Sequence, residues 1–169
     1  MDGSIKIRGV NHVALRVRDV ESSAEFYKGV LGFTEDVDRP MGIMALLRAP
    51  TSTNHHDLAL LQIGPDAADD SPHSVGMFHF ALEVETMDDL VKARDRFATA
   101  GCLDSETDHG ATKSVYAHDP DNNIVELTWV LPRVEWGEWE SAAPIKKAVD
   151  ISHEAQERHS ASAATVATA

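Results

Sequence analysis

The chain opens with a stretch in which apolar and polar side chains alternate. Between Ile5 and Val17, Val13, Leu15 and Val17 fall on one face, and the other face carries His12, Ala14 and Arg16. A period of two residues is typical of a β-strand with one buried face. The pattern therefore predicts a strand here, with His12 on the face opposite the valines.

A helix signal follows this strand. Asp19 is a residue type that caps helix N-termini, apolar residues recur at helical spacing from Val20 to Val30, and Gly32 is a typical stop. Two short apolar runs come next, at 43–47 and 58–63, and they are separated by glycine, proline and a polar turn. The first half of the chain is thus predicted to contain one strand, one helix and further strands.

The second half restarts the same pattern. Residues 77–84 again read as a strand, Thr86 as a helix cap and Gly101 as the end of that helix. Apolar stretches at 114–117 and 123–130 predict two more strands. The order of elements matches that of the first half.

This restart is an internal repeat that can be checked by alignment. NHVALRV at 11–17 falls on FHFALEV at 78–84 with an offset of 67, and the same offset places 58–60 on 125–127. Two strand–helix–strand units could share a period by chance, but the repeated H-x-A-L-x-V makes this less probable. A repeat of this size predicts two copies packed about a pseudo-twofold axis.

Composition limits the possible functions. A net charge of −13 over 169 residues disfavours nucleic acid and anionic membranes as partners, and no apolar run is long enough to cross a bilayer. The single cysteine, Cys102, cannot form an internal disulfide, and the amino terminus lacks a secretory signal. We therefore expect one soluble, cytoplasmic domain.

Glu126 interrupts an apolar strand, and a buried carboxylate needs a cation, a base or a proton. The repeat supplies a histidine at the start of each copy, His12 and His79, and pairs Glu126 with Ala59. A single histidine in a strand is more often a hydrogen-bonded structural residue than a ligand. Together, however, two imidazoles and one carboxylate form the ligand set of non-haem Fe(II) oxygenases, although Zn(II) or Mn(II) could occupy it.

Ala59 bears on the kind of metal chemistry. A related site with four protein ligands would need a carboxylate or an imidazole at this position, and alanine provides neither. The metal would then keep open positions for a bidentate substrate and a small gas molecule, which favours a catalytic over a structural ion.

These segments resemble a known superfamily. NHVALRVRDVESSAEFYKGVLGF and FHFALEVETMDDL are similar to the opening segments of vicinal oxygen chelate proteins, and TDHGATKSVYAHDPDNNIVEL is similar to the signature of type I extradiol ring-cleavage dioxygenases. The similarity covers residues 7–130 and departs at Asn122, where the family usually has Gly or Pro; Asn also tolerates a left-handed turn.

The resemblance implies an α+β fold of two βαβββ modules, at 7–64 and 75–131, that form one curved, partly open barrel around a metal site. It implies that His12, His79 and Glu126 bind Fe(II), with Mn(II) as an alternative metal. The substrate would then be a catechol, with O₂ as the second substrate.

The resemblance also implies catalytic residues. NHHDLAL matches the stretch that carries an acid–base histidine, which would be His56, although strand parity places His55 rather than His56 on the face of Ala59. His109 and Tyr116, in the dioxygenase-like signature, would hydrogen-bond the substrate oxygen and orient the catechol. If each residue is considered alone, His109 is better interpreted as a surface histidine and Tyr116 as a half-buried aromatic residue of a strand.

Two rival functions share this fold. A glyoxalase-like lyase or isomerase would use the metal as a Lewis acid without O₂, and a drug-binding protein would need no metal. We expect one domain at 1–135, an extension at 136–169 with a helix at about 145–158 and a mobile Ala/Ser/Thr tail, and assembly into a homo-oligomer.

Overall fold

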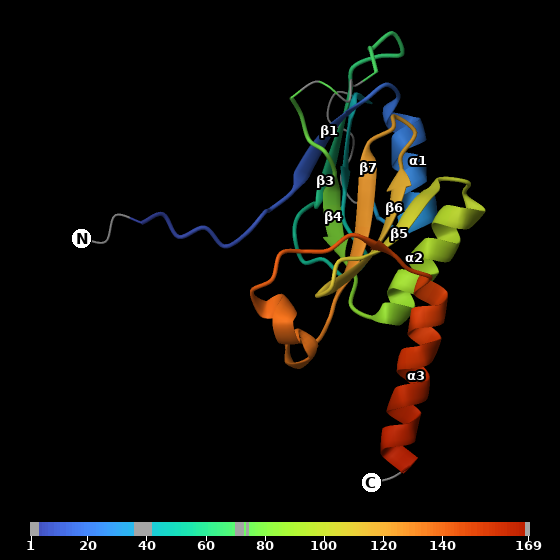
Figure 1. Cartoon of the computed structure of the whole chain (residues 1–169). Coiled ribbons are helices and arrows are strands. Elements are labelled where there is room, and N and C mark those ends of the chain that lie inside the picture. The colour runs from blue at the N-terminus through green and yellow to red at the C-terminus, as the bar shows by residue number, and fades with distance from the viewer. Residues whose placement is uncertain (1–3, 36–41, 70–72, 74, 168–169) are drawn as a thin grey trace. The chain divides into compact units, whose positions relative to one another are not determined.

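A computed structural model describes residues 4–35, 42–69, 73 and 75–167 of the chain (Figure 1). The chain divides into two compact units, Met1–Asp70 and Ser71–Ala169. Among the described residues, no helix is both long and apolar enough to cross a membrane.

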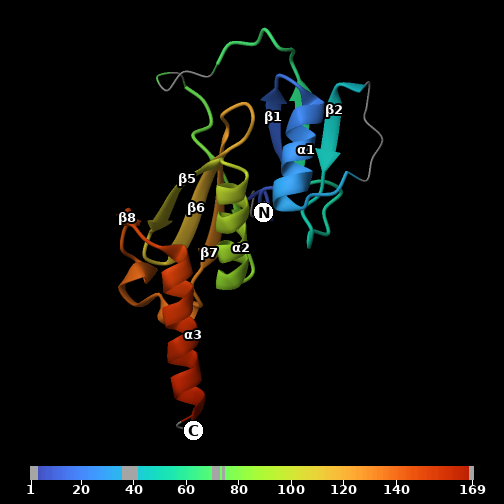
Figure 2. The same ribbon diagram turned by 90° about the vertical axis from the view of Figure 1, so that its right-hand side faces the viewer.

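The first unit is a small three-stranded sheet with one helix. Its elements are β1 (Val13–Val17), α1 (Val20–Leu31), β2 (Met44–Leu47) and β3 (Leu58–Gln62), and the strand order is β1-β3-β2 (Figure 2). β1 and β3 are parallel, whereas β2 and β3 are antiparallel. A single bridge between Thr34 and Arg48 stands where a further strand of the module would pair.

Helix α1 begins and ends as its sequence predicts. The Asp19 carboxylate accepts hydrogen bonds from the backbone N–H groups of Glu21 and Ser22, which would otherwise lack partners in the first turn. Gly32 ends the helix with a left-handed φ of 78°, a conformation that costs glycine little. Between these ends, Ala24 and Tyr27 are fully buried and fix the helix on the sheet.

The second unit contains a complete βαβββ module. Its elements are β4 (Phe80–Glu83), α2 (Met87–Thr99), β5 (Leu103–Asp108), β6 (Thr112–His118) and β7 (Ile124–Val130). A short eighth strand, β8 (Lys147–Ala148), extends the sheet to the order β4-β7-β6-β5-β8. Thr86 caps α2 through its hydroxyl, which accepts from the Asp89 N–H.

The strand registers confirm the internal repeat. Ala14 of β1 pairs with Ala59 of β3, and Ala81 of β4 pairs with Glu126 of β7, both in parallel ladders. Each partner in the second pair lies 67 residues after its counterpart, which is the offset found in the sequence. The expected α+β fold built on two repeated modules is therefore correct.

The C-terminal extension (residues 136–169) adds β8 and a helix to the second unit. Helix α3 (Ile151–Ala167) packs against α2 and buries Ile151 and Ala155 (Figure 2). It begins later than the helix predicted at 145–158, because the residues just before it pair with β5 instead. It also ends later than predicted, at Ala167. Part of the Ala/Ser/Thr-rich end is therefore helical.

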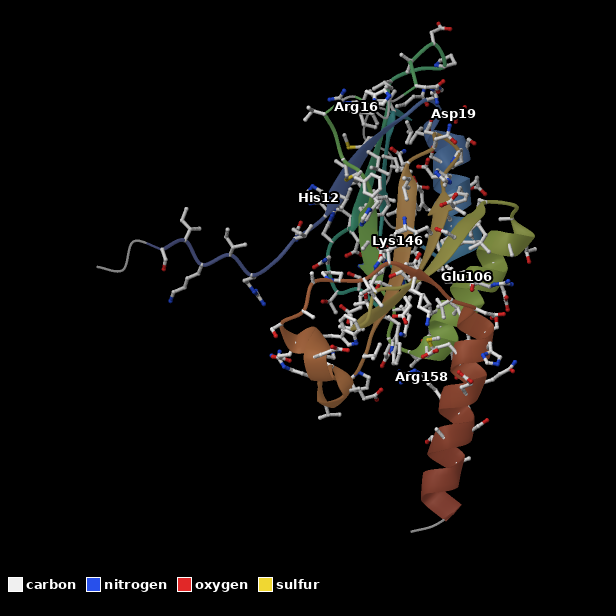
Figure 3. All side chains as sticks on the ribbon, viewed as in Figure 1. His12, Arg16, Asp19, Glu106, Lys146 and Arg158 are labelled. Carbon is white, nitrogen blue, oxygen red and sulfur yellow. The ribbon has the colours of Figure 1, made fainter. Side chains whose placement is uncertain are left out.

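Two first strands are shorter than their patterns predict. β1 begins at Val13 and not at Ile5, and β4 begins at Phe80 and not at Met77. His12 (Figure 3) and His79 therefore lie immediately before β1 and β4, not within them. Their equivalence is kept, because each precedes its strand by one residue.

Candidate functional site

Glu126 and His79 meet in the second unit. The Glu126 carboxylate, with a side chain only 9% exposed, lies 2.9 Å from Nε2 of His79. Glu126 projects from β7, and His79 lies one residue before the neighbouring parallel strand β4. The buried carboxylate is therefore beside an imidazole, as burial of a charge demands.

This pair has the geometry of two adjacent metal ligands. Ligand atoms about 2.1 Å from one ion and at right angles to each other are about 3 Å apart, close to the 2.9 Å between Nε2 and Oε2. The other nitrogen of His79, Nδ1, is buried and has no hydrogen-bond partner within the described residues. Nε2 and Glu126 thus form a donor set that suits a divalent cation.

Tyr116 lies directly across the ladder from Glu126. The two residues are paired in the antiparallel register of β6 and β7. Burial, followed by the neighbouring negative charge of Glu126, raises the pKa of Tyr116 to about 12. The phenol therefore keeps its proton at neutral pH and remains a hydrogen-bond donor.

His109 completes a chain of polar groups in this unit. Its Nε2 lies 2.9 Å from the Tyr116 hydroxyl, and its Nδ1 lies 2.7 Å from the carbonyl oxygen of Ile145. The polar chain therefore runs from His79 through Glu126, Tyr116 and His109 to a backbone oxygen. Such a series can hold a substrate oxygen and move a proton to or from it.

The turn between β6 and β7 holds this register. Asp119 accepts hydrogen bonds from the backbone N–H groups of Asp121 and Asn123 and from the Asn123 amide. Asn122 adopts a left-handed φ of 64°, the conformation that its place in the signature led us to expect. The turn therefore fixes which residue of β6 faces Glu126.

The first unit gathers three histidines at the start of its sheet. The His12 and His56 rings lie 4.5 Å apart between centroids, and Nδ1 of His55 lies 3.0 Å from Nδ1 of His56. Nδ1 of His12 donates to the Asn11 side-chain oxygen at 2.9 Å. In the neutral ring, Nε2 of His12 then has a lone pair, which is the form in which an imidazole binds metal.

The structure distinguishes between the two adjacent histidines. His56 is half-buried against His12, whereas His55 is exposed. His56 lies two residues before β3 begins, so strand parity does not govern its direction. Burial lowers the pKa of His56, the charges of His12 and His55 lower it further, and Asp57 partly opposes them. His56 is thus held neutral and able to accept a proton.

Asp57 is a residue that sequence reasoning missed. Its carboxylate accepts hydrogen bonds from the Ala49 N–H at 2.9 Å, the Ser52 hydroxyl at 2.8 Å and the Asn54 amide at 2.8 Å. These bonds close the loop before β3 and fix the position of its neighbour His56. The polar run Thr-Ser-Thr-Asn before it could have indicated these hydrogen bonds, but the same run is equally typical of an ordinary turn.

The two units carry different parts of the predicted set. Glu126, His79, Tyr116 and His109 come together in the second unit, while His12 and His56 come together in the first. Within the described residues of either unit taken alone, no three His, Cys, Asp or Glu side chains gather around one ion position. The three-ligand set remains a prediction.

The chain belongs to the Glyoxalase/Bleomycin resistance protein/Dioxygenase superfamily, whose family model matches residues 9–127. A catechol-2,3-dioxygenase of Bacillus subtilis is 28% identical over 130 residues, which is 75% of this chain and 43% of the relative. Biphenyl-2,3-diol 1,2-dioxygenase 3 of Rhodococcus globerulus is 30% identical over 120 residues, 69% of this chain and 60% of the relative. The chain thus spans less than two thirds of the length of these two relatives.

The chain is also similar to a further enzyme in sequence and to a solved domain in structure. A trivalent organoarsenical cleaving enzyme of a Bacillus species is 30% identical over 131 residues, covering 73% of this chain and 74% of that enzyme. The crystal structure of a glyoxylase/bleomycin resistance protein/dioxygenase domain from Frankia superposes with a TM-score of 0.61 at 24% identity, covering 74% of this chain and 99% of that one. The structural similarity shows the fold.

Proposed function

We propose that the chain is an Fe(II)-dependent extradiol dioxygenase that cleaves the ring of a catecholic substrate with O₂, next to the diol. His12, His79 and Glu126 would hold the ferrous ion. The observation that carries the proposal is the polar chain of the second unit, in which Glu126 lies 2.9 Å from His79 and faces the hydrogen-bonded pair of Tyr116 and His109.

A bound ferrous ion would supply electron transfer between the aromatic diol and O₂ and would hold both substrates. The two imidazoles and the carboxylate would contribute one negative charge, so a singly ionised catechol would bring the divalent site to neutrality. Ala59, which has no ligand atom at the position equivalent to Glu126, would leave room for both substrates.

His56 would act as the base for the substrate. A catechol brings two phenolic protons, and a neutral imidazole can accept one of them when it lies within hydrogen-bond reach. The lowered pKa of His56, caused by burial and by its histidine neighbours, keeps this imidazole unprotonated. The hydrogen bonds of the Asp57 carboxylate, which close the loop before β3, would hold the His56 imidazole in place.

Tyr116 and His109 would orient the diol. The raised pKa of Tyr116, due to burial and to Glu126, keeps its hydroxyl protonated. Nε2 of His109 lies 2.9 Å from the hydroxyl oxygen and fixes its position. A phenol oxygen held in this way can accept one hydrogen bond from a substrate hydroxyl without reorganising. The relatives named as catechol and biphenyl-diol dioxygenases support an aromatic diol as the substrate class.

The proposal is tested by anaerobic loading of the protein with Fe(II), followed by a catechol and then O₂. We expect oxygen uptake together with a yellow ring-opened product. With ¹⁸O-labelled O₂, both oxygen atoms should enter that product. Iron-loaded protein that consumes no O₂ with catechol, 3-alkylcatechols or biphenyl-2,3-diol would refute the proposal.

The same preparation separates the rival functions. A glyoxalase-like enzyme would convert a hemithioacetal without O₂ and would prefer Zn(II) or Ni(II), but it would want a fourth protein ligand that Ala59 does not provide. A drug-binding protein would bind its ligand without metal. Cleavage of an organoarsenical calls for soft thiolate contacts, and the chain has a single, half-buried cysteine whose pKa is raised by burial.

A further inference from the structure

His109 is held by a backbone group of the C-terminal extension, outside the repeat. Its Nδ1 lies 2.7 Å from the Ile145 carbonyl oxygen. A carbonyl oxygen only accepts hydrogen bonds, so Nδ1 must carry the proton of this contact. In the neutral ring, Nε2 then has a lone pair and accepts the hydrogen bond of the Tyr116 hydroxyl, 2.9 Å away.

We propose that Ile145 is a positioning residue whose carbonyl fixes His109 in the Nδ1–H tautomer and thereby directs the Tyr116 proton away from Glu126. The inference deepens the proposed function and rests on it for its role in turnover. The tautomer itself follows from the contacts of the second unit and does not depend on the reaction.

The opposite tautomer would change the state of Glu126. Nε2–H would donate to the Tyr116 oxygen, and the single proton of the hydroxyl would then turn to its other neighbour, the carboxylate across the ladder. A carboxylate that accepts this bond is a weaker ligand, because the proton competes for the same lone pairs. The Nδ1–H tautomer therefore leaves Glu126 available to a cation.

The Ile145 carbonyl is held in position by the sheet. Two residues further along the chain, Lys147 pairs with Asp108 and Ala148 with Thr107, so β8 runs along the edge strand that leads into His109. The N–H of Ile151, at the start of α3, donates to the Glu106 carboxylate at 2.9 Å. Both anchors lie on β5, close in sequence to the histidine that the carbonyl holds.

Trp139 covers the turn that carries His109. A Cβ atom placed on Gly110 would lie 2.4 Å from Cδ2 of the Trp139 ring, so the indole rests directly on the backbone next to the histidine. Gly110 also adopts a φ of +89°, which a residue with a side chain rarely takes. The glycine thus allows the indole of the extension to pack against the turn and to limit the motion of His109.

Heteronuclear NMR of full-length, metal-free protein labelled with ¹⁵N-histidine tests the tautomer directly. The nine histidines give separate ring correlations, and the spectrum of His109→Gln identifies the signal of His109. We expect a single Nδ1–H tautomer with an unprotonated Nε2. An Nε2–H ring, or a ring that averages between both tautomers as a solvated imidazole does, would overturn the inference.

Two tryptophan variants test the part played by the extension. Trp139→Ala should convert the His109 signal to a mixture of tautomers and weaken Fe(II) binding on the order of tenfold, the low end for groups that orient metal ligands. Trp136→Ala is the matched control, because its indole N–H bonds to the Leu131 carbonyl and its ring contacts Arg133. The control should leave the His109 signal unchanged.

The readouts separate this inference from the proposed function. An Nδ1–H ring in protein that consumes no O₂ would refute the dioxygenase and keep the tautomer assignment, whereas an Nε2–H ring in active protein would do the reverse. If Trp139→Ala does not fold, the wild-type spectrum still decides. If it folds with an unchanged His109 signal, the extension does not control the tautomer and the role given to it is wrong.

Discussion

Tyr116 and Glu126 face each other across the β6–β7 ladder, one phenol opposite one buried carboxylate. The register turns two residues ten positions apart in the sequence into direct neighbours. Burial and the charge of Glu126 hold the pKa of Tyr116 at about 12, so the phenol stays protonated. A hydrogen-bond donor therefore stands beside the carboxylate that we propose as a metal ligand.

Replacing Glu126 with Gln should abolish metal binding. The amide keeps the volume of the side chain and loses its charge, so we expect Fe(II) affinity to fall by on the order of a hundredfold or more. Glu83→Gln is the control, because Glu83 is an exposed glutamate of the same sheet. Calorimetric titration with Fe(II) under anaerobic conditions measures both, and full affinity in Glu126→Gln would disprove the ligand assignment.

Replacing Tyr116 with Phe should slow turnover and spare metal binding. The ring still fills its place on β6, but the substrate oxygen loses one oriented hydrogen-bonding partner, so kcat should fall by about a hundredfold. Steady-state oxygen uptake measures the change. Tyr27→Phe alters the other tyrosine, which lies in the core of the first unit; an equal loss of kcat in that variant would point to a general effect on folding.

Asn122→Ala should destabilise the second unit by about 1 kcal/mol. Asn122 holds a φ of 64°, and alanine pays the steric cost of this left-handed conformation without the local hydrogen bonding that asparagine offers. Asn122→Gly should be neutral or slightly stabilising, since glycine adopts this φ freely. Chemical denaturation of the three proteins checks the order; equal stability of all three would contradict it.

Local signals explain why much of the fold could be predicted. Asp19 and Gly32 cap α1 through contacts within a few residues, and the offset of 67 is visible in the sequence alone. The turn conformation of Asn122 likewise follows from residue type. The ends of α1, the repeat and the turn at Asn122 were therefore predicted correctly, whereas the starts of β1, β4 and α3 were not.

Long-range contacts explain what the sequence did not reveal. β8 has only two residues, both exposed, and exists because the edge of β5 offers free hydrogen-bonding groups. Nothing near Ile145 or His109 in the sequence signals that the carbonyl of one, 36 positions away, would hold the ring of the other. The roles predicted for His12, His56 and His79 are untested by the fold and stay proposals.

Acid should weaken the pair of Lys113 and Asp108, which lie 2.6 Å apart beside His109. Burial pushes the pKa of Asp108 upward, but the hydrogen bonds from Lys113 and Gly110 and the charge of Lys113 outweigh it and hold the pKa below 3.8. A lowered folded-state pKa stabilises the protein above the unfolded value and loses this effect as the pH falls through the folded value.

Lys113→Met should therefore cost about 1–3 kcal/mol of unfolding free energy at pH 7, because it leaves a largely buried carboxylate without its cation. The difference from wild type should shrink as the pH drops below about 4. Lys146 is an exposed lysine of the extension (Figure 3). Lys146→Met should therefore change neither the unfolding free energy at pH 7 nor its dependence on pH. Denaturant titrations at a series of pH values measure the unfolding free energy of each protein. A difference between wild type and Lys113→Met that stays constant with pH would rule out the electrostatic explanation.

Ala59→Glu should change the chemistry of the proposed metal site. Ala59 pairs with Ala14 as Glu126 pairs with Ala81, so the new carboxylate would stand at the repeat-equivalent position of the existing one. A fourth ligand should raise the affinity for a divalent metal and occupy a position that O₂ or the catechol needs. We expect tighter metal binding together with loss of oxygen uptake. Ala59→Gln adds the same volume without the charge, so it should not tighten binding. An Ala59→Glu protein that turns over catechol at the wild-type rate would show that position 59 is remote from the metal.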